Sequence, residues 1–120
     1  MKITKKIFIA DDDEAIVDSI TMMLEVMDYQ VDSTSDGTQV IKALEDCPDL
    51  LLLDIWMSGI DGREVCQQIK ANLVTAKIPV LMVSASRQIK ESALACGADD
   101  FLAKPFEMSD LIEKIEQLTN

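Results

Sequence analysis

The chain has 120 residues, of which 48% are hydrophobic and 28% charged, a balance typical of a single globular domain over residues 1–120. Its formal net charge of −11 argues against direct binding to the phosphate backbone of nucleic acid, which depends on lysine and arginine. It has no histidine, which excludes catalysis by Ser-His or Cys-His pairs and excludes the chain as a phosphohistidine carrier.

The apolar runs are far shorter than the roughly 20 residues that a membrane-spanning helix needs. At the N-terminus, acidic residues follow a short apolar run too soon for a secretory signal peptide. We therefore expect a cytoplasmic protein that does not insert into membranes. Cys47, Cys66 and Cys96 are widely spaced, which predicts buried free thiols instead of a disulfide framework or a thiolate metal site.

Apolar runs bounded by turn residues predict strands, and segments with helical spacing predict helices between them. The predicted strands are 6–10, 30–33, 50–55, 79–84 and 100–103, and the predicted helices are 15–27, 37–44, 62–73, 87–96 and 109–118. Five alternations of near-continuous apolar strands with amphipathic helices predict an α/β fold, a doubly wound parallel sheet with helices on both faces.

The first predicted helix carries Ile16, Ile20, Met23 and Met27 on one stripe. We expect its methionines, including Met22, to fill the core, although a methionine-rich face can also serve as an adaptable binding surface.

Single residues also carry local predictions. Gly97 is predicted to end a helix, and Ser109 is predicted to cap the start of the last one. Basic residues occur singly after the N-terminal segment, so we expect most to be solvated, with Lys104 as the exception.

Polar side chains stand at the ends of four predicted strands. They are Asp11, Asp12 and Asp13 after the first, Asp54 in the third, Ser84 in the fourth and Lys104 after the fifth. Because the carboxyl ends of parallel strands share one edge of a sheet, we expect these groups to meet there. Each also has an ordinary reading, since acidic residues begin helices, serine occupies turns and lysine lies at surfaces.

Together these groups suggest phosphoryl chemistry. Two carboxylates about 4 Å apart repel by roughly 4 kcal/mol at an effective dielectric of about 20, so three in one pocket require a cation or raised pKa values. Oxygen ligands with open positions suit Mg²⁺, and a lysine and a hydroxyl opposite suit a phosphoryl group. Asp54 is then the natural nucleophile, giving an acyl phosphate.

The motifs IFIADDDEAI, LLLLDIWMSGIDG, PVLMVSAS and DDFLAKPF occur in this order, and through them the whole chain resembles the response-regulator receiver domains of two-component signalling, especially the single-domain, chemotaxis-regulator-like ones. The resemblance implies the flavodoxin-like strand order 2-1-3-4-5. It also implies a protein that takes a phosphoryl group from a histidine kinase or phosphotransfer protein, with Mg²⁺ as cofactor, and switches conformation to control a protein partner. Such a domain catalyses its own phosphorylation and slow dephosphorylation without being a classical enzyme.

The resemblance also implies residue roles. Asp11 and Asp12 would bind Mg²⁺, Asp12 directly and Asp11 largely through water. Asp54 would be both phosphoacceptor and metal ligand, and the backbone carbonyl of Trp56 would complete the protein ligands.

Further roles concern the conformational switch. Ser84 would move to the phosphoryl group, Lys104 would pair with it, and Phe101 would turn inward as the second switch residue. The Lys104-Pro105 peptide would be cis, and residues 87–118 would form the surface that a downstream protein reads.

The chain departs from the family pattern at a few positions. Ser58 replaces the usual proline, which predicts a less rigid loop after Asp54, and Phe101 lacks the hydroxyl of a tyrosine. Trp56 and Ser86 stand where the family tunes dephosphorylation, and Trp56 could shield the acyl phosphate or simply pack the loop.

Other functions stay open at this point. A haloacid-dehalogenase-like phosphatase would use Asp11 as nucleophile and Asp13 as acid/base, but Ala15 replaces its usual Thr or Val and Asp54 is then unexplained. A docking module of the same fold would never be phosphorylated. Because the chain ends soon after the last predicted helix, we expect output through another protein, or a fragment of a longer chain.

Overall fold

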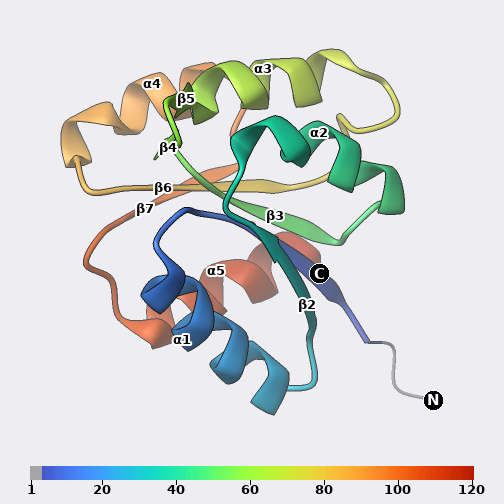
Figure 1. Cartoon of the computed structure of the whole chain (residues 1–120), viewed down its shortest axis with the longest axis vertical. Helices are drawn as coiled ribbons and strands as arrows, with labels where there is room; N and C mark the ends of the chain where they lie inside the picture. Colours follow the sequence, from blue (N-terminus) through green and yellow to red (C-terminus); the bar gives the residue numbers. More distant parts are fainter. Residues whose placement is uncertain (1–3) are drawn as a thin grey trace.

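Five parallel strands form one sheet in the order β2-β1-β3-β6-β7 (Figure 1). The computed structural model describes residues 4–120, with the backbone alone at Arg87, and positions 1–3 of the predicted domain lie outside the described residues. The strands are β1 (Lys6–Ala10), β2 (Gln30–Thr34), β3 (Leu50–Asp54), β6 (Val80–Ser84) and β7 (Asp100–Ala103). The predicted doubly wound α/β fold and its strand order are confirmed, β6 and β7 being the fourth and fifth strands of the sheet.

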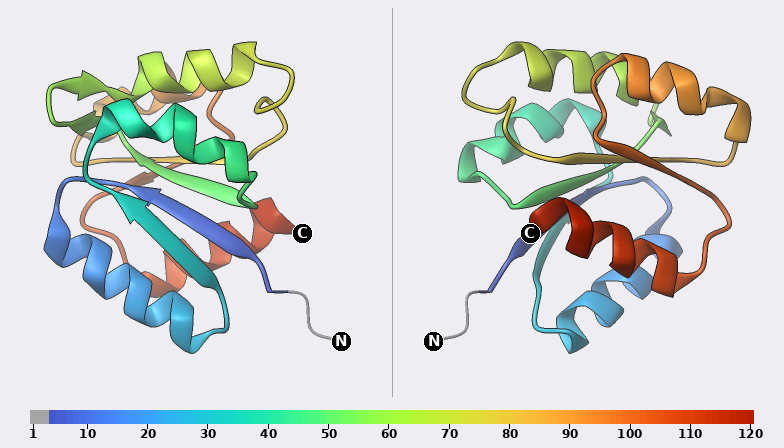
Figure 2. Two further views of the ribbon diagram at one scale, coloured as in Figure 1. Left: turned by 45° about the vertical axis from the view of Figure 1, so that its right-hand side comes forward. Right: turned by 180° about the vertical axis from the view of Figure 1, so that it is seen from behind.

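Helices cover both faces of this sheet, as the views in Figures 1 and 2 show. On one face lie α1 (Glu14–Val26) and α5 (Met108–Thr119), and on the other lie α2 (Val40–Ala43), α3 (Gly62–Ala71) and α4 (Lys90–Ala95). Among residues 4–120, none of these helices is long and apolar enough to cross a bilayer.

The run of four leucines in β3 is explained by burial on both faces of the sheet. Leu50 and Leu52 pack in the layer of α1 and α5, whereas Leu51 and Leu53 pack in the layer of α2, α3 and α4. Since side chains alternate along a strand, a central strand with two covered faces needs apolar residues at every position. Asp54 breaks this pattern at the end of β3, where the strand reaches the edge of the sheet.

The predicted helix 37–44 is shorter and less regular than expected. Its α-helical part is α2 alone, and it is flanked by the 3₁₀ turns Gly37–Gln39 and Leu44–Asp46. The ends of helices often tighten into 3₁₀ turns, and in a segment this short the two ends make up most of its length. The predicted helix 87–96 divides similarly into the 3₁₀ turn Arg87–Ile89 and α4.

The predicted burial of the methionines of α1 is wrong. Met22 is 69% exposed, and Met23 and Met27 are also exposed. The sheet instead meets the side of the helix that carries Ile20 and Leu24. Consecutive residues of an α-helix point in directions roughly 100° apart. Since Leu24 faces the core, Met23 points away from it.

Two further local predictions are corrected, and one is confirmed. Cys66 and Cys96 are buried free thiols, but Cys47 is exposed because it ends a 3₁₀ turn at the surface with a φ of 49°. Ser109 is the second residue of α5, which begins one residue earlier with Glu107 at its N-cap. Gly97 follows α4 with a φ of 103°, as a helix-ending glycine should.

Besides Lys104, Lys70 is a basic residue whose side chain is bound within the fold. Its Nζ donates hydrogen bonds to the carbonyls of Ala76 at 3.1 Å and Ile78 at 2.8 Å. It also pairs with the Asp99 carboxylate at 2.9 Å. Lys70 therefore joins α3 to the loop before β6 and to the turn before β7.

Candidate functional site

The predicted site residues lie at the carboxyl edge of the sheet. Asp11 follows β1, Asp54 ends β3, Ser84 ends β6 and Lys104 follows β7. Asp11 is 4% exposed and Asp54 8% exposed, and Ser84 is buried with them. The edge of the sheet thus holds two buried carboxyl groups and a buried hydroxyl group.

Lys104 connects the two buried carboxylates. Its Nζ lies 3.0 Å from Asp11 Oδ2 and 3.6 Å from Asp54 Oδ2. Its backbone N–H donates to the carbonyl of Ser84 at 2.8 Å, so the pairing of β6 with β7 places it at the site. The exceptional role predicted for Lys104 among the basic residues is consistent with these contacts.

Three carboxylates form a cluster with the geometry of a cation site. Asp11, Asp12 and Asp54 each offer an oxygen, and these oxygens lie within 4.8 Å of one another. An all-oxygen donor set of this kind fits Mg²⁺. Asp13 stands outside this cluster, because its carboxylate accepts hydrogen bonds from the amides of Ala15 and Ile16 and caps α1.

The electrostatics of the cluster set Asp54 apart. Burial raises the pKa of Asp54 to about 6, helped by the charge of Asp11 and a hydrogen bond with it, and opposed by Lys104. Burial is also the largest influence on the pKa of Lys104 and would lower it, but Asp11 and Asp54 together raise it above its usual value. The protein groups of the site are thus short of positive charge despite the lysine.

The predicted switch residues lie on β6 and β7, the two strands that follow β3 in the sheet. Ser84 Oγ accepts a hydrogen bond from the amide of Ser86 at 3.1 Å. Phe101 is buried in β7. The Lys104-Pro105 peptide is cis, as the resemblance implied.

A small hairpin that was not predicted carries the segment after Asp54. Its strands β4 (Trp56–Met57) and β5 (Ile60–Asp61) are joined by Ser58 and Gly59, whose φ angles of 51° and 76° suit a two-residue turn. The Ser58-Gly59 pair could have suggested the turn. The two strands could not be predicted, because a strand of two residues is too short to show an alternating pattern of apolar and polar residues.

Ser58 holds this hairpin against the site. Its amide donates to Asp12 Oδ2 at 3.0 Å, and its hydroxyl donates to the carbonyl of Ser35 at 3.0 Å. A proline could neither donate the first bond nor adopt this φ. The residue that was expected to loosen the loop therefore ties it to two neighbouring segments.

Gly62 allows the chain to pass close to Asp54. A Cβ atom at this position would lie 2.6 Å from the backbone carbonyl oxygen of Asp54 and 3.0 Å from Ile55 Cα. The start of α3 can therefore pack against the end of β3 only because residue 62 has no side chain.

Comparison with known sequences gives one family. A family model described as the response regulator receiver domain matches residues 7–116. The DNA-binding dual master transcriptional regulator RpaA of Synechocystis is 38% identical over 116 residues, which are 94% of this chain and 48% of that protein. The response regulator MprA of Mycobacterium leprae is 34% identical, over 94% of this chain and 50% of that protein. The chain thus spans about half the length of the curated relatives it matches.

Solved structures agree with this result. A response regulator of Chloroflexus aurantiacus superimposes with a TM-score of 0.92, at 27% identity and 98% coverage of both chains. The receiver domain of the sensor histidine kinase PA1611 from Pseudomonas aeruginosa, which holds a magnesium ion in its active-site cleft, gives 0.87 at 25% identity and 98% coverage of both. The response regulator TrrA of Thermotoga maritima, in complex with Mg²⁺-BeF, gives 0.86 at 26% identity, over 96% of this chain and 99% of that one.

Proposed function

This chain belongs to the family of response regulator receiver domains, and we propose that it is a phosphoacceptor that takes a phosphoryl group onto Asp54 with Mg²⁺. The observation that carries the proposal is the environment of Asp54. Its carboxylate lies 3.6 Å from the Lys104 ammonium and within 4.8 Å of oxygens of two further carboxylates. A nucleophile, a cation-binding set and a fixed positive charge therefore share one small volume.

In the proposed reaction a carboxylate oxygen of Asp54 attacks the phosphorus of the donor. An O–P bond forms, the bond to the donor's imidazole nitrogen breaks, and the electron pair leaves with that nitrogen. Asp11, Asp12, Asp54 and the backbone carbonyl of Trp56 would hold Mg²⁺. When bound, Mg²⁺ would supply the positive charge that neutralises the phosphoryl oxygens.

Lys104 and Ser84 would complete the contacts to the transferred group. Lys104 Nζ already faces Asp54, and it would exchange its bond to Asp11 for one to a phosphoryl oxygen. The Ser84 hydroxyl would leave the Ser86 amide to donate to another phosphoryl oxygen. Phe101, one strand away in β7, would respond as the second switch residue, favouring a second conformation of residues 87–118.

The proposed partners follow from this role. Receiver domains accept phosphoryl groups from histidine kinases, so we propose a histidine kinase or phosphotransfer protein as donor and a cytoplasmic location. A downstream protein would read the surface of residues 87–118. RpaA is named a DNA-binding regulator, but this chain spans 48% of it, and its net charge of −11 does not favour DNA binding by the residues present here.

The phosphatase alternative is disfavoured by the contacts of its two required acids. Asp11 accepts hydrogen bonds on both oxygens, from the Asp13 amide at 2.9 Å and from Lys104 at 3.0 Å. Asp13 is engaged as the N-cap of α1 and is absent from the carboxylate cluster. Neither residue is presented as a free nucleophile or acid/base, whereas the docking-module alternative is left to experiment.

Incubation with acetyl phosphate, with and without Mg²⁺, tests the proposal by intact mass. Wild type and Asp46→Asn, an exposed acid before the start of β3 and so at the opposite end of that strand from Asp54, should each gain one phosphoryl group only with Mg²⁺. Asp54→Asn should gain none. If wild type gains no phosphoryl group, the result would support the docking module. Hydrolysis of acetyl phosphate that persists in Asp54→Asn but is lost in Asp11→Asn would support a phosphatase.

A further inference from the structure

Arg63, in the first turn of α3, joins three neighbouring elements through its guanidinium group. Its Nε lies 2.9 Å and 3.1 Å from the two carboxylate oxygens of Asp61, and its Nη2 lies 2.7 Å from Asp61 Oδ2. Its Nη1 donates to the hydroxyl of Ser92 in α4 at 2.8 Å. Its Cζ lies 5.6 Å from the centre of the Trp56 ring, within the range of a cation–π contact.

Asp61 serves as the fixed end of this arrangement. Its Oδ1 also accepts the backbone N–H of Arg63 at 2.9 Å and so caps α3. With main chain and side chain of Arg63 both bonded to one carboxylate, the plane of the guanidinium group is fixed relative to the hairpin. The contacts to Trp56 and Ser92 are then the two through which Arg63 acts on other parts of the molecule.

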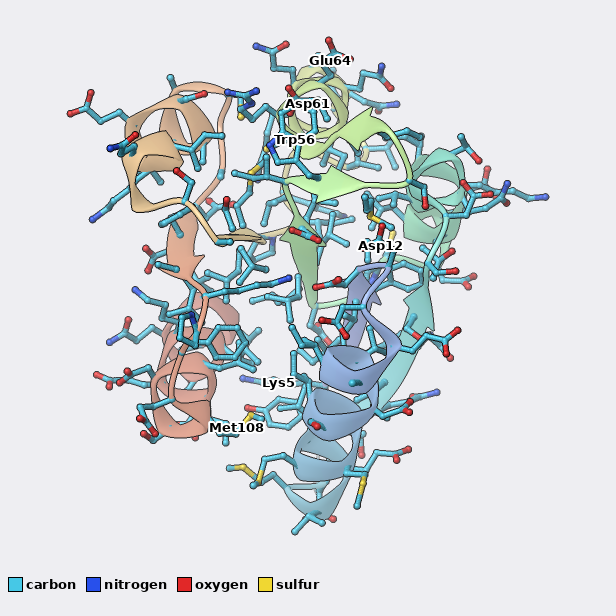
Figure 3. All side chains as sticks on the ribbon, turned by 60° about the vertical axis from the view of Figure 1, so that its left-hand side comes forward. Lys5, Asp12, Trp56, Asp61, Glu64 and Met108 are labelled. Atoms are coloured by element: carbon cyan, nitrogen blue, oxygen red, sulfur yellow. The ribbon has the colours of Figure 1, made fainter. Side chains whose placement is uncertain are left out.

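The Trp56 side chain lies largely outside the core and is in contact with the guanidinium group of Arg63. The residue is 56% exposed. It pairs with Asp61 across the β4–β5 hairpin, and Figure 3 shows the two residues close together beside the start of α3. The guanidinium group therefore restrains both residues of this cross-strand pair. One of them, Trp56, lies two residues after Asp54.

We infer that Arg63 is a positioning residue that holds the Trp56 segment in place for metal binding and links it to α4. The inference rests on the proposed function, in which the Trp56 carbonyl is a metal ligand and α4 belongs to the surface read by the partner. A displacement of the hairpin when Asp54 is occupied would be passed through the guanidinium group to Ser92, and so to α4. This link is separate from the one expected through Ser84 and Phe101.

Variants at Arg63 and Ser92 separate the two halves of the inference. Arg63→Gln removes the charge and the fork of donors, Arg63→Lys keeps the charge without the fork, and Ser92→Ala removes the contact to α4 alone. Lys42→Gln on α2 and Ser19→Ala on α1 are matched controls, because both residues are exposed and lie outside residues 87–118. Trp56 is the only tryptophan in the chain, so its emission reports on this segment without ambiguity.

Two measurements are made on the whole chain. Mg²⁺ is titrated against Trp56 emission, and hydrogen exchange of the α4 amides is compared with and without Mg²⁺ and beryllofluoride, which stands in for the phosphoryl group. We expect Arg63→Gln to shift the emission of the metal-free protein and to raise the Kd for Mg²⁺ about tenfold, the lower end of the effect of losing a group that supports a metal ligand. Arg63→Lys should raise the Kd similarly, because an ammonium group cannot form the fork.

Ser92→Ala should keep the emission and the Mg²⁺ Kd of wild type within twofold but lose at least half of the α4 exchange response. The positioning role would be overturned if Arg63→Gln had the same Mg²⁺ Kd and emission spectrum as Lys42→Gln. If Arg63→Gln does not fold, the same comparison is made with Arg63→Lys. A full α4 response in Ser92→Ala would overturn the link. If wild type takes no phosphoryl group, both the proposed function and this inference fail. If wild type is phosphorylated normally but the variants equal their controls in Mg²⁺ Kd, emission and α4 exchange, this inference alone is overturned.

Discussion

Replacing Asp54 by asparagine should stabilise the metal-free protein. Burial, then the charge of Asp11, raises the pKa of Asp54 from 3.8 to about 6. Between these values the native protein keeps a proton that the unfolded chain has released, so the free energy of unfolding of wild type falls as pH rises through this window. At 1.36 kcal/mol per pKa unit, the loss amounts to about 3 kcal/mol once Asp54 is ionised in both states.

Asparagine has nearly the same shape and does not titrate. The gain in the free energy of unfolding should therefore be near zero at pH 4, rise through pH 6 and level off at about 2–3 kcal/mol by pH 8. Urea unfolding in the presence of a chelator, followed by Trp56 fluorescence, measures it, with Asp46→Asn as the control. Added Mg²⁺ should reduce the difference in the free energy of unfolding between Asp54→Asn and wild type, because Mg²⁺ binds the native wild type more tightly than the native variant.

The reasoning would be refuted if Asp54→Asn and wild type differed in the free energy of unfolding by the same amount at pH 4 and at pH 8, because a neutral Asp54 should resemble asparagine. It would also be refuted if Asp54→Asn were no more stable than Asp46→Asn at pH 8. Either result would mean that the ionised carboxylate is not penalised by its burial beside Asp11.

Three further substitutions test the geometry of the site. Lys104→Gln leaves two buried carboxylates without their ammonium partner, so the free energy of unfolding at pH 8 without metal should fall by about 3 kcal/mol in urea unfolding, and an unchanged value would contradict the pairing. Gly62→Ala places a Cβ 2.6 Å from the Asp54 carbonyl oxygen, so it should lower the free energy of unfolding by about 1–3 kcal/mol in thermal unfolding, and a rise in Tm would show that the contact is easily relieved. Ser58→Pro removes the amide donor to Asp12, so calorimetric titration should show weaker Mg²⁺ binding, whereas Ser58→Gly, which keeps the donor, should bind as wild type does.

The sheet and most of its edge could be predicted because they follow local rules. The bounds of β1 and β7 coincide with the predicted 6–10 and 100–103, since apolar runs with sharp polar ends define a buried strand. Asp11, Asp54 and Lys104 each stand where such a run stops. Parallel pairing then brings them together without any further information from the sequence.

The remaining features depend on contacts between distant parts of the chain. The contact of Lys70 was not predicted, because its partner Asp99 is 29 residues away and comes near only when α3 packs beside β6 and β7. Arg63 and Ser92 are also 29 residues apart. On α1, Met23 and Leu24 are both apolar, and which of them faces the sheet is decided by how the helix is rotated as it packs.

The bond between Lys104 and Asp11 joins residues 93 positions apart in the chain. During synthesis the carboxylates of β1 and β3 leave the ribosome well before β7, which carries the lysine. In a growing chain, the carboxylates of Asp11 and Asp54 are therefore made before the ammonium group that pairs with them. In the proposed function, the site that would receive a phosphoryl group is therefore complete only when β7 has paired with β6.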